Sequence, residues 1–309
     1  MKTEAPAFAH VLVVGAGAIG GLYAARLASR VPVTLLVRTP EAADAIRRDG
    51  LRVVGRETFT ATVEATTTVA ALASRTLVLL TTKAHDSQAA LGPLLPLLHE
   101  DTVVLCVQNG LYSERAVAAV VQGRCTVLRA ITNFGAIFRE PGLVDYRWAA
   151  ETYIEPAPQA AAVATLLNEA GLEGRVTDRL HYEMWRKLIF NCVVNPVTGI
   201  TGMEVGWIGA AGLDPLKQAI IDECLAVARA DGLQTDEDFL AQINAAYVGN
   251  PNHSSTLQDL RRGRRTEIDF LIGGVAALGR QFGIPCPVND ALTALVKQLE
   301  QRSRATTEP

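Results

Sequence analysis

The sequence feature that most constrains the fold is a glycine-rich segment close to the amino terminus. An apolar run over His10–Val14 leads directly into Gly15–Gly20, which reads Gly-Ala-Gly-Ala-Ile-Gly, and a helical pattern follows to about Ser29. A strand that passes into a helix through such glycines is typical of the first βα unit of an open parallel sheet. We therefore expect the chain to begin with an α/β domain.

Alternating strand and helix patterns continue through the first half of the chain. Mostly apolar runs at Val33–Val37, Leu77–Thr81 and Val103–Val107 are typical of parallel strands covered on both faces. This alternation predicts a Rossmann-type, doubly wound, mostly parallel sheet. The remaining expected elements are a β-hairpin within Leu51–Val69, a strand at Cys125–Thr132, and helices at Glu41–Asp49, Ser87–Leu98 and Ser113–Val121.

The second half of the chain has helical patterns and no strand pattern. A length of 309 residues exceeds the ~150 residues of one typical domain, so two domains are expected. One helix is expected from Asp178 to a stop at Asn195-Pro196. We predict a Rossmann-type domain over residues 1–177 and an all-helical domain over residues 178–309. Its other helices are expected near Asp214–Ala230, Asp236–Tyr247, Arg264–Phe282 and Pro287–Gln301.

Composition excludes several classes of protein. A net charge of −3 argues against nucleic-acid or anionic-membrane partners. No apolar run reaches the ~18 residues needed to cross a bilayer. The five cysteines are scattered without Cys-x-x-Cys spacing, which argues against a disulfide framework or a zinc site and suits a reducing cytoplasm. We therefore expect a cytoplasmic protein without a metal, membrane or nucleic-acid partner.

The glycine-rich segment has the spacing of a dinucleotide-binding loop. Gly15 permits a tight turn, Gly17 allows the backbone to approach a pyrophosphate, and Gly20 allows close packing of helix on strand. The helix amino terminus adds free N–H groups and a partial positive charge for the anion. The alternative is a βα turn that is merely tight. The predicted cofactor-binding residues of this loop are Gly15, Ala16, Gly17, Ala18, Ile19 and Gly20.

The end of the second strand indicates which dinucleotide is bound. Proteins that bind NAD usually place Asp or Glu there, to bind the ribose 2′-hydroxyl. This chain has no acid at that point and reads Val37-Arg38-Thr39. Arg38 is placed to pair with a 2′-phosphate, and Thr39 could add a hydroxyl, so the pattern favours NADP(H). The alternative is that Arg38 only begins a solvated loop.

Two further strand ends carry polar residues. Lys83 follows one strand in Thr82-Lys83-Ala84, and Asn109 follows another in Gln108-Asn109-Gly110. In open α/β sheets ligands bind outside the carboxyl ends of the strands, so both side chains are candidates for contacting cofactor or substrate. Asn109-Gly110 is also an ordinary turn signal, and by itself we favour that interpretation.

Lys187, Asn191 and Asn195 lie four residues apart in a segment that is otherwise largely apolar. At 3.6 residues per turn they share one face of a helix. A helix of this kind should be buried, and its polar side chains then need partners. The partners are either a ligand or polar groups of neighbouring elements, and the segment alone does not decide between them.

Together these motifs resemble the ketopantoate reductase (2-dehydropantoate 2-reductase) family over nearly the whole chain. The motifs after Trp185 are the most distinctive, because many unrelated dehydrogenases share the glycine loop. The resemblance rests on Gly15–Gly20, Arg38, Thr82-Lys83-Ala84, Gln108-Asn109-Gly110, Trp185-Arg186-Lys187 with Asn191 and Asn195-Pro196, Ser254–Asp259, and Arg265–Asp269.

The resemblance implies reduction of 2-dehydropantoate to (R)-pantoate with NADPH, a step of pantothenate biosynthesis. It implies that Lys187 is the catalytic lysine, that Glu267 is its partner, and that the first domain binds NADP. Lys83 would lie on the cofactor side, and Asn109 between the nicotinamide and the substrate. The substrate would be held in the helical domain by Asn191, Asn195 and Ser255.

The residue types also suit this chemistry without the family. Hydride delivery to a ketone builds negative charge on its oxygen, and an ammonium such as that of Lys187 stabilises this charge and can donate a proton. Amides and a hydroxyl can bind the carboxylate of a small 2-oxo acid. Glu267 could accept a substrate hydroxyl or anchor the lysine. Asp259 and Asp269, which flank Glu267, are interpreted as caps or ion-pair partners.

The chain departs from the family after Asn195. Well-known members have a further substrate-binding Asn in this region, and Thr198–Gly206 contains none. The departure supports one alternative, a paralogous NADPH-dependent reductase of another small 2-oxo acid. A second alternative is a non-catalytic dinucleotide-sensing protein, although a sensor has no need of Lys187 and Glu267. The apolar helices of the second domain could also bury a homodimer interface.

Overall fold

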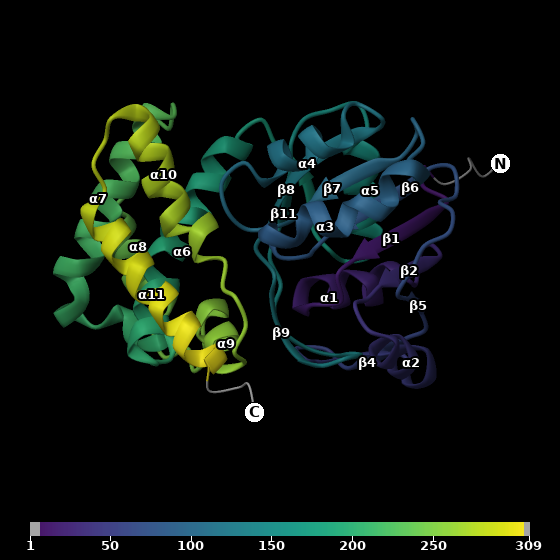
Figure 1. Cartoon of the computed structure of the whole chain (residues 1–309), viewed down its shortest axis with the longest axis horizontal. Helices are drawn as coiled ribbons and strands as arrows, with labels where there is room; N and C mark the ends of the chain where they lie inside the picture. The colour runs from purple at the N-terminus through teal and green to yellow at the C-terminus, as the bar shows by residue number, and fades with distance from the viewer. Residues whose placement is uncertain (1–6, 306–309) are drawn as a thin grey trace. The chain divides into compact units, whose positions relative to one another are not determined.

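Eight strands form one sheet in the first part of the computed structural model, which describes residues 7–305. The strand order is β12-β11-β8-β7-β6-β1-β2-β5, and every neighbouring pair is parallel except β8 and β11. The predicted doubly wound, mostly parallel sheet is therefore confirmed (Figure 1). The strands are β1 His10–Val14, β2 Val33–Leu36, β5 Glu64–Thr66, β6 Thr76–Leu80, β7 Val103–Cys106, β8 Thr126–Thr132, β11 Thr152–Ile154 and β12 Gly174–Val176.

Successive residues of the central strands point into two different cores, which explains why these strands are apolar throughout. In β1, Val11 and Val13 belong to one buried cluster, whereas Leu12 and Val14 belong to another. Side chains alternate between the faces of a sheet, so a strand covered on both faces needs an apolar residue at every position. The helices of this unit are α1 Ala18–Leu27, α2 Pro40–Asp49, α3 Ser87–Leu91, α4 Ser113–Val121 and α5 Ala160–Glu169.

A second, four-stranded sheet has the order β4-β3-β10-β9. Strands β3 (Leu51–Gly55) and β4 (Phe59–Ala61) pair antiparallel, as the predicted hairpin requires. The predicted hairpin segment Leu51–Val69 also contains β5, which is not part of the hairpin and instead pairs parallel to β2 in the large sheet. Strands β9 (Gly135–Glu140) and β10 (Leu143–Trp148), like β11 and β12, were not expected from the sequence.

The described residues divide into two compact units. The first contains both sheets and extends to Leu180, apart from Asn109–Leu111. The second contains Asn109–Leu111 and the chain from His181 onward, and its described residues include no strand, so the predicted helical region is confirmed. Its helices are α6 Leu180–Thr201, α7 Asp214–Ala230, α8 Phe239–Ala246, α9 Ser255–Arg261, α10 Ile272–Phe282 and α11 Pro287–Ala305, with short 3-10 helices at Val205–Gly209, Ala211–Leu213 and Ile268–Phe270 (Figure 1).

The predicted stop at Asn195-Pro196 is wrong, because α6 continues through Pro196 to Thr201. Proline removes one N–H from the helical ladder, which costs about 3 kcal/mol in an exposed helix. Here the flanking residues Val193, Val194 and Val197 are buried, and their packing favours continuation of the helix. The predicted helix from Arg264 also begins later, at Ile272.

Within residues 7–305, no helix combines the length and the apolar character needed to span a membrane.

Candidate functional site

The glycine-rich loop has the geometry that its sequence predicts. Gly15 has φ +107°, in the region that favours glycine, and a Cβ on Gly20 would lie 1.9 Å from the Gly15 oxygen. Gly17 is exposed, has no atom within 4 Å of its Cβ position, and precedes α1 without a side-chain cap. The start of α1 therefore has no capping side chain and follows a turn at Gly15 that favours glycine. This arrangement fits a dinucleotide pyrophosphate.

The loop lies at the switch point of the large sheet. Strands β1 and β6 are neighbours, and the chain leaves the carboxyl end of β1 toward β2 but leaves that of β6 toward β7, on the opposite side. The hydroxyl of Thr81, directly after β6, donates to the carbonyl of Gly15 over 2.8 Å and lies 3.0 Å from that of Val14. This hydroxyl holds the loop against the end of the neighbouring strand.

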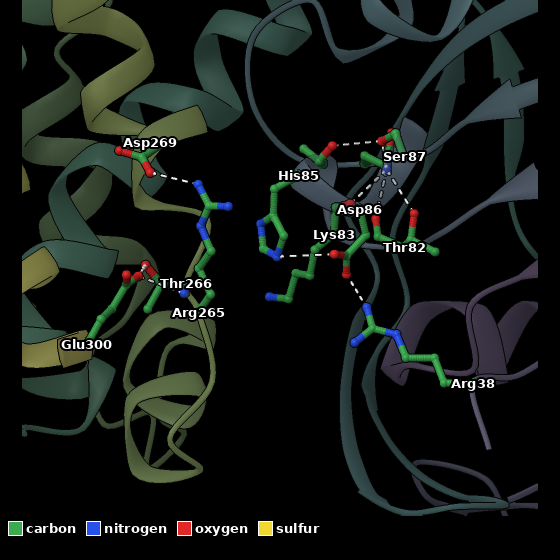
Figure 2. Close-up of polar contacts among 12 residues, drawn as sticks. Arg38, Thr82, Lys83, His85, Asp86, Ser87, Arg265, Thr266, Asp269 and Glu300 are labelled. Atoms are coloured by element: carbon green, nitrogen blue, oxygen red, sulfur yellow. Dashed lines mark hydrogen bonds and ion pairs between the residues drawn. The ribbon is translucent and has the colours of Figure 1, made fainter. Parts of the chain in front are cut away.

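Arg38 follows β2 as predicted, and its side chain is 77% exposed. It forms an ion pair with Asp86, which sequence reasoning missed (Figure 2). The hydroxyl of Thr39 accepts from the N–H of Ala42 over 3.3 Å and so caps α2. A 2′-phosphate at this position would therefore meet an arginine that already has a carboxylate partner.

Gln108 holds the segment that carries Lys83. Its Nε2 lies 2.9 Å from the carbonyl oxygen of Thr82, 2.8 Å from Ser87 Oγ and 3.3 Å from the carbonyl oxygen of Lys83. Gln108 is 5% exposed, and its Oε1 is a buried atom without a hydrogen-bond partner in the described structure. Lys83, which is half-buried, thus projects from a backbone fixed by a buried amide (Figure 2).

Asn109 and Glu267 come together in the helical unit. Asn109 Nδ2 donates to Glu267 Oε2 over 3.3 Å, and Glu267 is 5% exposed. Gly110 has φ +94°, and a Cβ there would lie 2.6 Å from the carbonyl oxygen of Phe270. Asn109-Gly110 therefore forms a turn, and Asn109 also contacts another predicted site residue, Glu267.

A chain of hydrogen bonds joins three of the predicted substrate-binding residues. Asn195 Oδ1 accepts from Ser255 Oγ over 3.0 Å and from the N–H of Thr256 over 3.2 Å. Asn195 Nδ2 donates to Asn191 Oδ1 over 3.3 Å. Asn195 is buried, Asn191 is half-buried and Ser255 is exposed, so the chain runs from the interior to the surface.

Part of the polar stripe on α6 has identified protein partners. Asn195 bonds to the first turn of α9. Its polar partners are therefore groups of a neighbouring element, which was the alternative to a ligand. The Asn191 carboxamide oxygen is engaged, which turns its Nδ2 into the donor left for a ligand. Lys187 is half-buried one turn earlier on the same face.

Buried contacts on α6 fix the orientation of this stripe. Trp185 is fully buried, and its indole N–H donates to Asp231 Oδ2 over 2.8 Å, while His181 Nε2 lies 2.9 Å from the same oxygen. Burial raises the pKa of the Cys192 thiol well above its ordinary value, so this residue behaves as a small apolar side chain. The helix can therefore present only one face to a ligand.

Asp269 is an ion-pair partner, as predicted. It lies 3.2 Å from Arg265 Nη2 and 2.9 Å from Lys297 Nζ. Partial burial acts to raise the pKa of Asp269, but the contacts with Lys297 and Arg265 outweigh it and the pKa is lowered. Among the described residues, no group of three His, Cys, Asp or Glu side chains could hold a metal ion.

A hollow of about 670 Å³ in the first unit lies away from every predicted site residue. It is lined by residues from the starts of parallel strands, including His10, Val33 and Glu64. Ligands of open α/β sheets bind at the opposite, carboxyl ends, so we assign no role to this hollow.

Two family models match the chain. Residues 11–159 match the model described as ketopantoate reductase PanE/ApbA. Residues 179–300 match the model described as ketopantoate reductase PanE/ApbA C terminal. Between them the two models span both compact units.

Individual proteins resemble the chain over nearly its full length. A 2-dehydropantoate 2-reductase of Pyrococcus horikoshii is 31% identical and covers 94% of this chain and 97% of its own. The crystal structure of a PanE/ApbA family ketopantoate reductase from Ralstonia eutropha JMP134 superimposes with a TM-score of 0.86 at 32% identity, covering 96% of this chain and 99% of that one. A complex of D-mandelate dehydrogenase with NADH has a TM-score of 0.84 at 25% identity, covering 95% and 99%.

Proposed function

Because the chain belongs to the ketopantoate reductase family, we propose that it reduces 2-dehydropantoate to (R)-pantoate with NADPH. As a member of this family it is a dinucleotide-dependent oxidoreductase. The observation that carries the finer proposal is the hydrogen-bonded set of Asn191, Asn195 and Ser255, with Lys187 on the same helical face. This set combines a cation with neutral donors, as reduction of a 2-oxo acid requires.

Lys187 would stabilise and protonate the substrate oxygen. The cofactor, when bound, supplies a hydride to the carbonyl carbon. The two electrons of the C=O π bond then move to oxygen, and the ammonium of Lys187 donates the proton that completes the hydroxyl group. An ammonium aimed at the oxygen that gains charge acts most strongly where water is excluded, and Lys187 is half-buried.

The substrate carboxylate would be held by neutral groups. Asn191 Nδ2 is a donor in the proposed site, and Asn195 orients Asn191 and Ser255 through its own carboxamide. The Ser255 hydroxyl has a single proton, so it would donate to the carboxylate in place of Asn195 Oδ1. Glu267, whose Oε2 accepts from Asn109, would accept a substrate hydroxyl or orient Lys187. In this assignment Asn195 acts on the substrate mainly through its neighbours.

We assign dinucleotide binding to residues 1–177 and acid binding to residues 178–309. The pyrophosphate would lie on Gly15–Gly20, the 2′-phosphate would pair with Arg38, and Lys83 would contact the cofactor. Free cysteines at all five positions suit the cytoplasm, where the pathway to pantothenate is expected. A homodimer stays a prediction.

A second candidate function is reduction of a different 2-oxo acid. The region after Asn195 supports it, because Thr198 is fully buried there and donates to the carbonyl of Val194 over 2.6 Å instead of facing a ligand. The likeness to D-mandelate dehydrogenase extends this alternative to acids with an aromatic substituent. A non-catalytic dinucleotide sensor is the remaining alternative.

One assay separates these functions. The loss of reduced nicotinamide absorbance is followed with 2-dehydropantoate, pyruvate, 2-oxoisovalerate and phenylglyoxylate, each with NADPH and with NADH. We expect the highest kcat/KM for 2-dehydropantoate with NADPH. A higher value for another acid would establish the second candidate, and the absence of turnover on every acid would contradict the enzyme assignment.

A further inference from the structure

We propose that Glu300, on α11, is a positioning residue that holds Glu267 in its working orientation. The proposal rests on the function proposed above, because it gives Glu300 a part in the same site. Glu300 is 33 positions from Glu267 in the sequence, and nothing in its surroundings there, Leu299-Glu300-Gln301, marks it as different from an exposed helical glutamate.

Glu300 accepts two hydrogen bonds from the residue that precedes Glu267. Its Oε1 accepts from the backbone N–H of Thr266 over 2.7 Å and also from the hydroxyl of Thr266 (Figure 2). The pair is buried, with Glu300 8% exposed and Thr266 2% exposed. Hydrogen bonds to a charged acceptor are roughly twice as strong as those between neutral groups.

The same contact reaches the residue that follows Glu267. The oxygen of the Thr266 hydroxyl accepts from the N–H of Ile268 over 3.2 Å. Glu300 therefore fixes Thr266 directly and Ile268 through the hydroxyl, so the backbone is held on both sides of Glu267. The carbonyl oxygen of Glu267 in turn accepts from the N–H groups of Phe270 over 2.9 Å and Leu271 over 3.1 Å. Little rotation of the Glu267 backbone remains.

The described residues place no cation against the Glu300 carboxyl group, which argues against a role in packing alone. Among residues 7–305, no Lys or Arg forms an ion pair with Glu300. A buried carboxylate without a cation is costly, and an apolar side chain would fill the same space at lower cost. What the carboxylate provides, and an apolar residue would not, is a strong acceptor for both donors of Thr266.

A second, weaker contact ties the same segment to α11. Lys297, one turn before Glu300, donates to Asp269 Oδ1 over 2.9 Å. Arg265 lies 3.2 Å from the other oxygen of Asp269 (Figure 2). These side chains are 31–48% exposed, and ion pairs that solvent reaches contribute little to stability. The buried contact of Glu300 therefore carries most of the positioning.

The test is a double-mutant cycle between Glu300→Ala and Glu267→Gln, read by kcat and KM for the 2-oxo acid. In the wild-type background, Glu300→Ala should lower kcat/KM on the order of 10–100-fold, because small misplacement of a reacting group has effects of this size. In the Glu267→Gln background it should have almost no further effect, because it acts through Glu267. An equal loss in both backgrounds would mean that Glu300 is merely structural and would overturn the proposal.

Matched variants complete the design. Glu300→Gln keeps an acceptor at Oε1 and should recover most of the activity, whereas Thr266→Val should resemble Glu300→Ala and serves if that variant does not fold. Arg280→Ala breaks the exposed ion pair between Arg280 and Asp290, which are 2.9 Å apart, and should leave kcat/KM unchanged. The dissociation constant for NADPH should stay within about twofold in every variant, because all the substituted residues lie outside the proposed dinucleotide-binding residues 1–177. Failure of Gln to recover more activity than Ala would overturn the proposal.

Hydrogen exchange distinguishes failure of this inference from failure of the proposed function. If the wild-type protein reduces no 2-oxo acid, the proposed function is wrong, but the contact itself is still testable. Exchange of the backbone N–H groups of Thr266 and Ile268 should be faster in Glu300→Ala than in the wild type, and unchanged in Arg280→Ala. Equal protection of both amides in the wild type and Glu300→Ala would overturn the inference.

Discussion

The side-chain amide of Asn109 donates a hydrogen bond to Glu267 Oε2 over 3.3 Å, although 158 positions separate the two residues. Asn109 follows a strand of the sheet, whereas Glu267 precedes a short helix near the carboxyl terminus. The distance is slightly beyond the usual 2.7–3.2 Å range for N–H···O bonds, roughly the limit of a useful contact. The hydrogen bond from Asn109 is therefore weak, and the Glu267 carboxylate can still adjust to a ligand.

This relationship predicts the effect of charge at position 109. Asn109→Ala should lower kcat/KM for the 2-oxo acid by about fivefold, since a typical hydrogen bond contributes about 1 kcal/mol. Asn109→Asp should be the more damaging change, because a second carboxylate beside Glu267 repels both Glu267 and an anionic substrate. Steady-state kinetics of the two variants provide the measurement. An Asp variant as active as the Ala variant would contradict the assignment of Glu267 to the substrate site.

Arg38→Ala should reduce the preference for NADPH over NADH. The lost contact is to a phosphate that only NADPH carries, and a charge-assisted hydrogen bond of about 1.5–3 kcal/mol corresponds to roughly a 10–100-fold loss of NADPH affinity. Affinity for NADH should change little. Fluorescence titration of both dinucleotides gives the two dissociation constants. An unchanged ratio would count against NADPH as the preferred cofactor.

Asp86→Asn should have the opposite effect to Arg38→Ala. The carboxylate of Asp86 neutralises Arg38 and would repel a 2′-phosphate, so its removal should tighten NADPH binding. NADH, which lacks the phosphate, serves as the internal control in the same titration. Weaker binding of NADPH by the variant would show instead that Asp86 holds Arg38 in its binding position.

Tyr23→Phe should make the protein less sensitive to alkaline pH. Burial raises the pKa of Tyr23 from 10.0 to about 12, although hydrogen bonds with Thr132 and Thr152 act to lower it. Between pH 10 and about 12 the unfolded chain ionises at Tyr23 while the folded protein does not, so stability falls as the pH rises. Phenylalanine does not ionise, so the Tyr23→Phe variant should lose less of its free energy of unfolding over this pH range.

The cost of Tyr23→Phe should appear at neutral pH. The Tyr23 hydroxyl donates to Thr132 Oγ1 over 2.7 Å and contacts Thr152 Oγ1, and losing such bonds costs about 1–2 kcal/mol. Urea unfolding at pH 8 and pH 11 provides both values. Equal pH dependence in the variant and the wild type would contradict the assigned role of Tyr23.

The sequence predicted the elements whose patterns are local. Three glycines at fixed spacing and strands apolar at every position determine the first βα unit and the two-faced sheet. Strands such as β11 and β12, each three residues long, were missed because they are stabilised by pairing with distant strands and have little pattern of their own. Pro196 was taken as a helix end because the buried packing around it cannot be inferred from the residues before it.

The sequence predicted which residues belong to the candidate site, but not which side chains they would contact. Lys187, Asn191 and Asn195 share a helical face because of their spacing alone. That Asn195 bonds to the first turn of α9, Arg38 to Asp86, and Thr266 to Glu300 depends on tertiary contacts between distant positions. No local signal distinguishes Asp86 or Glu300 from the other acids on the surface of a helix.

Lys187→Ala provides the most direct test of the central claim, that this ammonium stabilises and protonates the reacting oxygen. Single-turnover reduction of 2-dehydropantoate, measured with saturating NADPH, should be slower by about 10²–10⁴-fold, the range for loss of a positioned proton donor. The dissociation constant for NADPH, measured on the same variant, should change less than about twofold, because Lys187 lies outside the proposed dinucleotide-binding residues 1–177. A rate within tenfold of the wild type would remove Lys187 from the reaction and contradict the account.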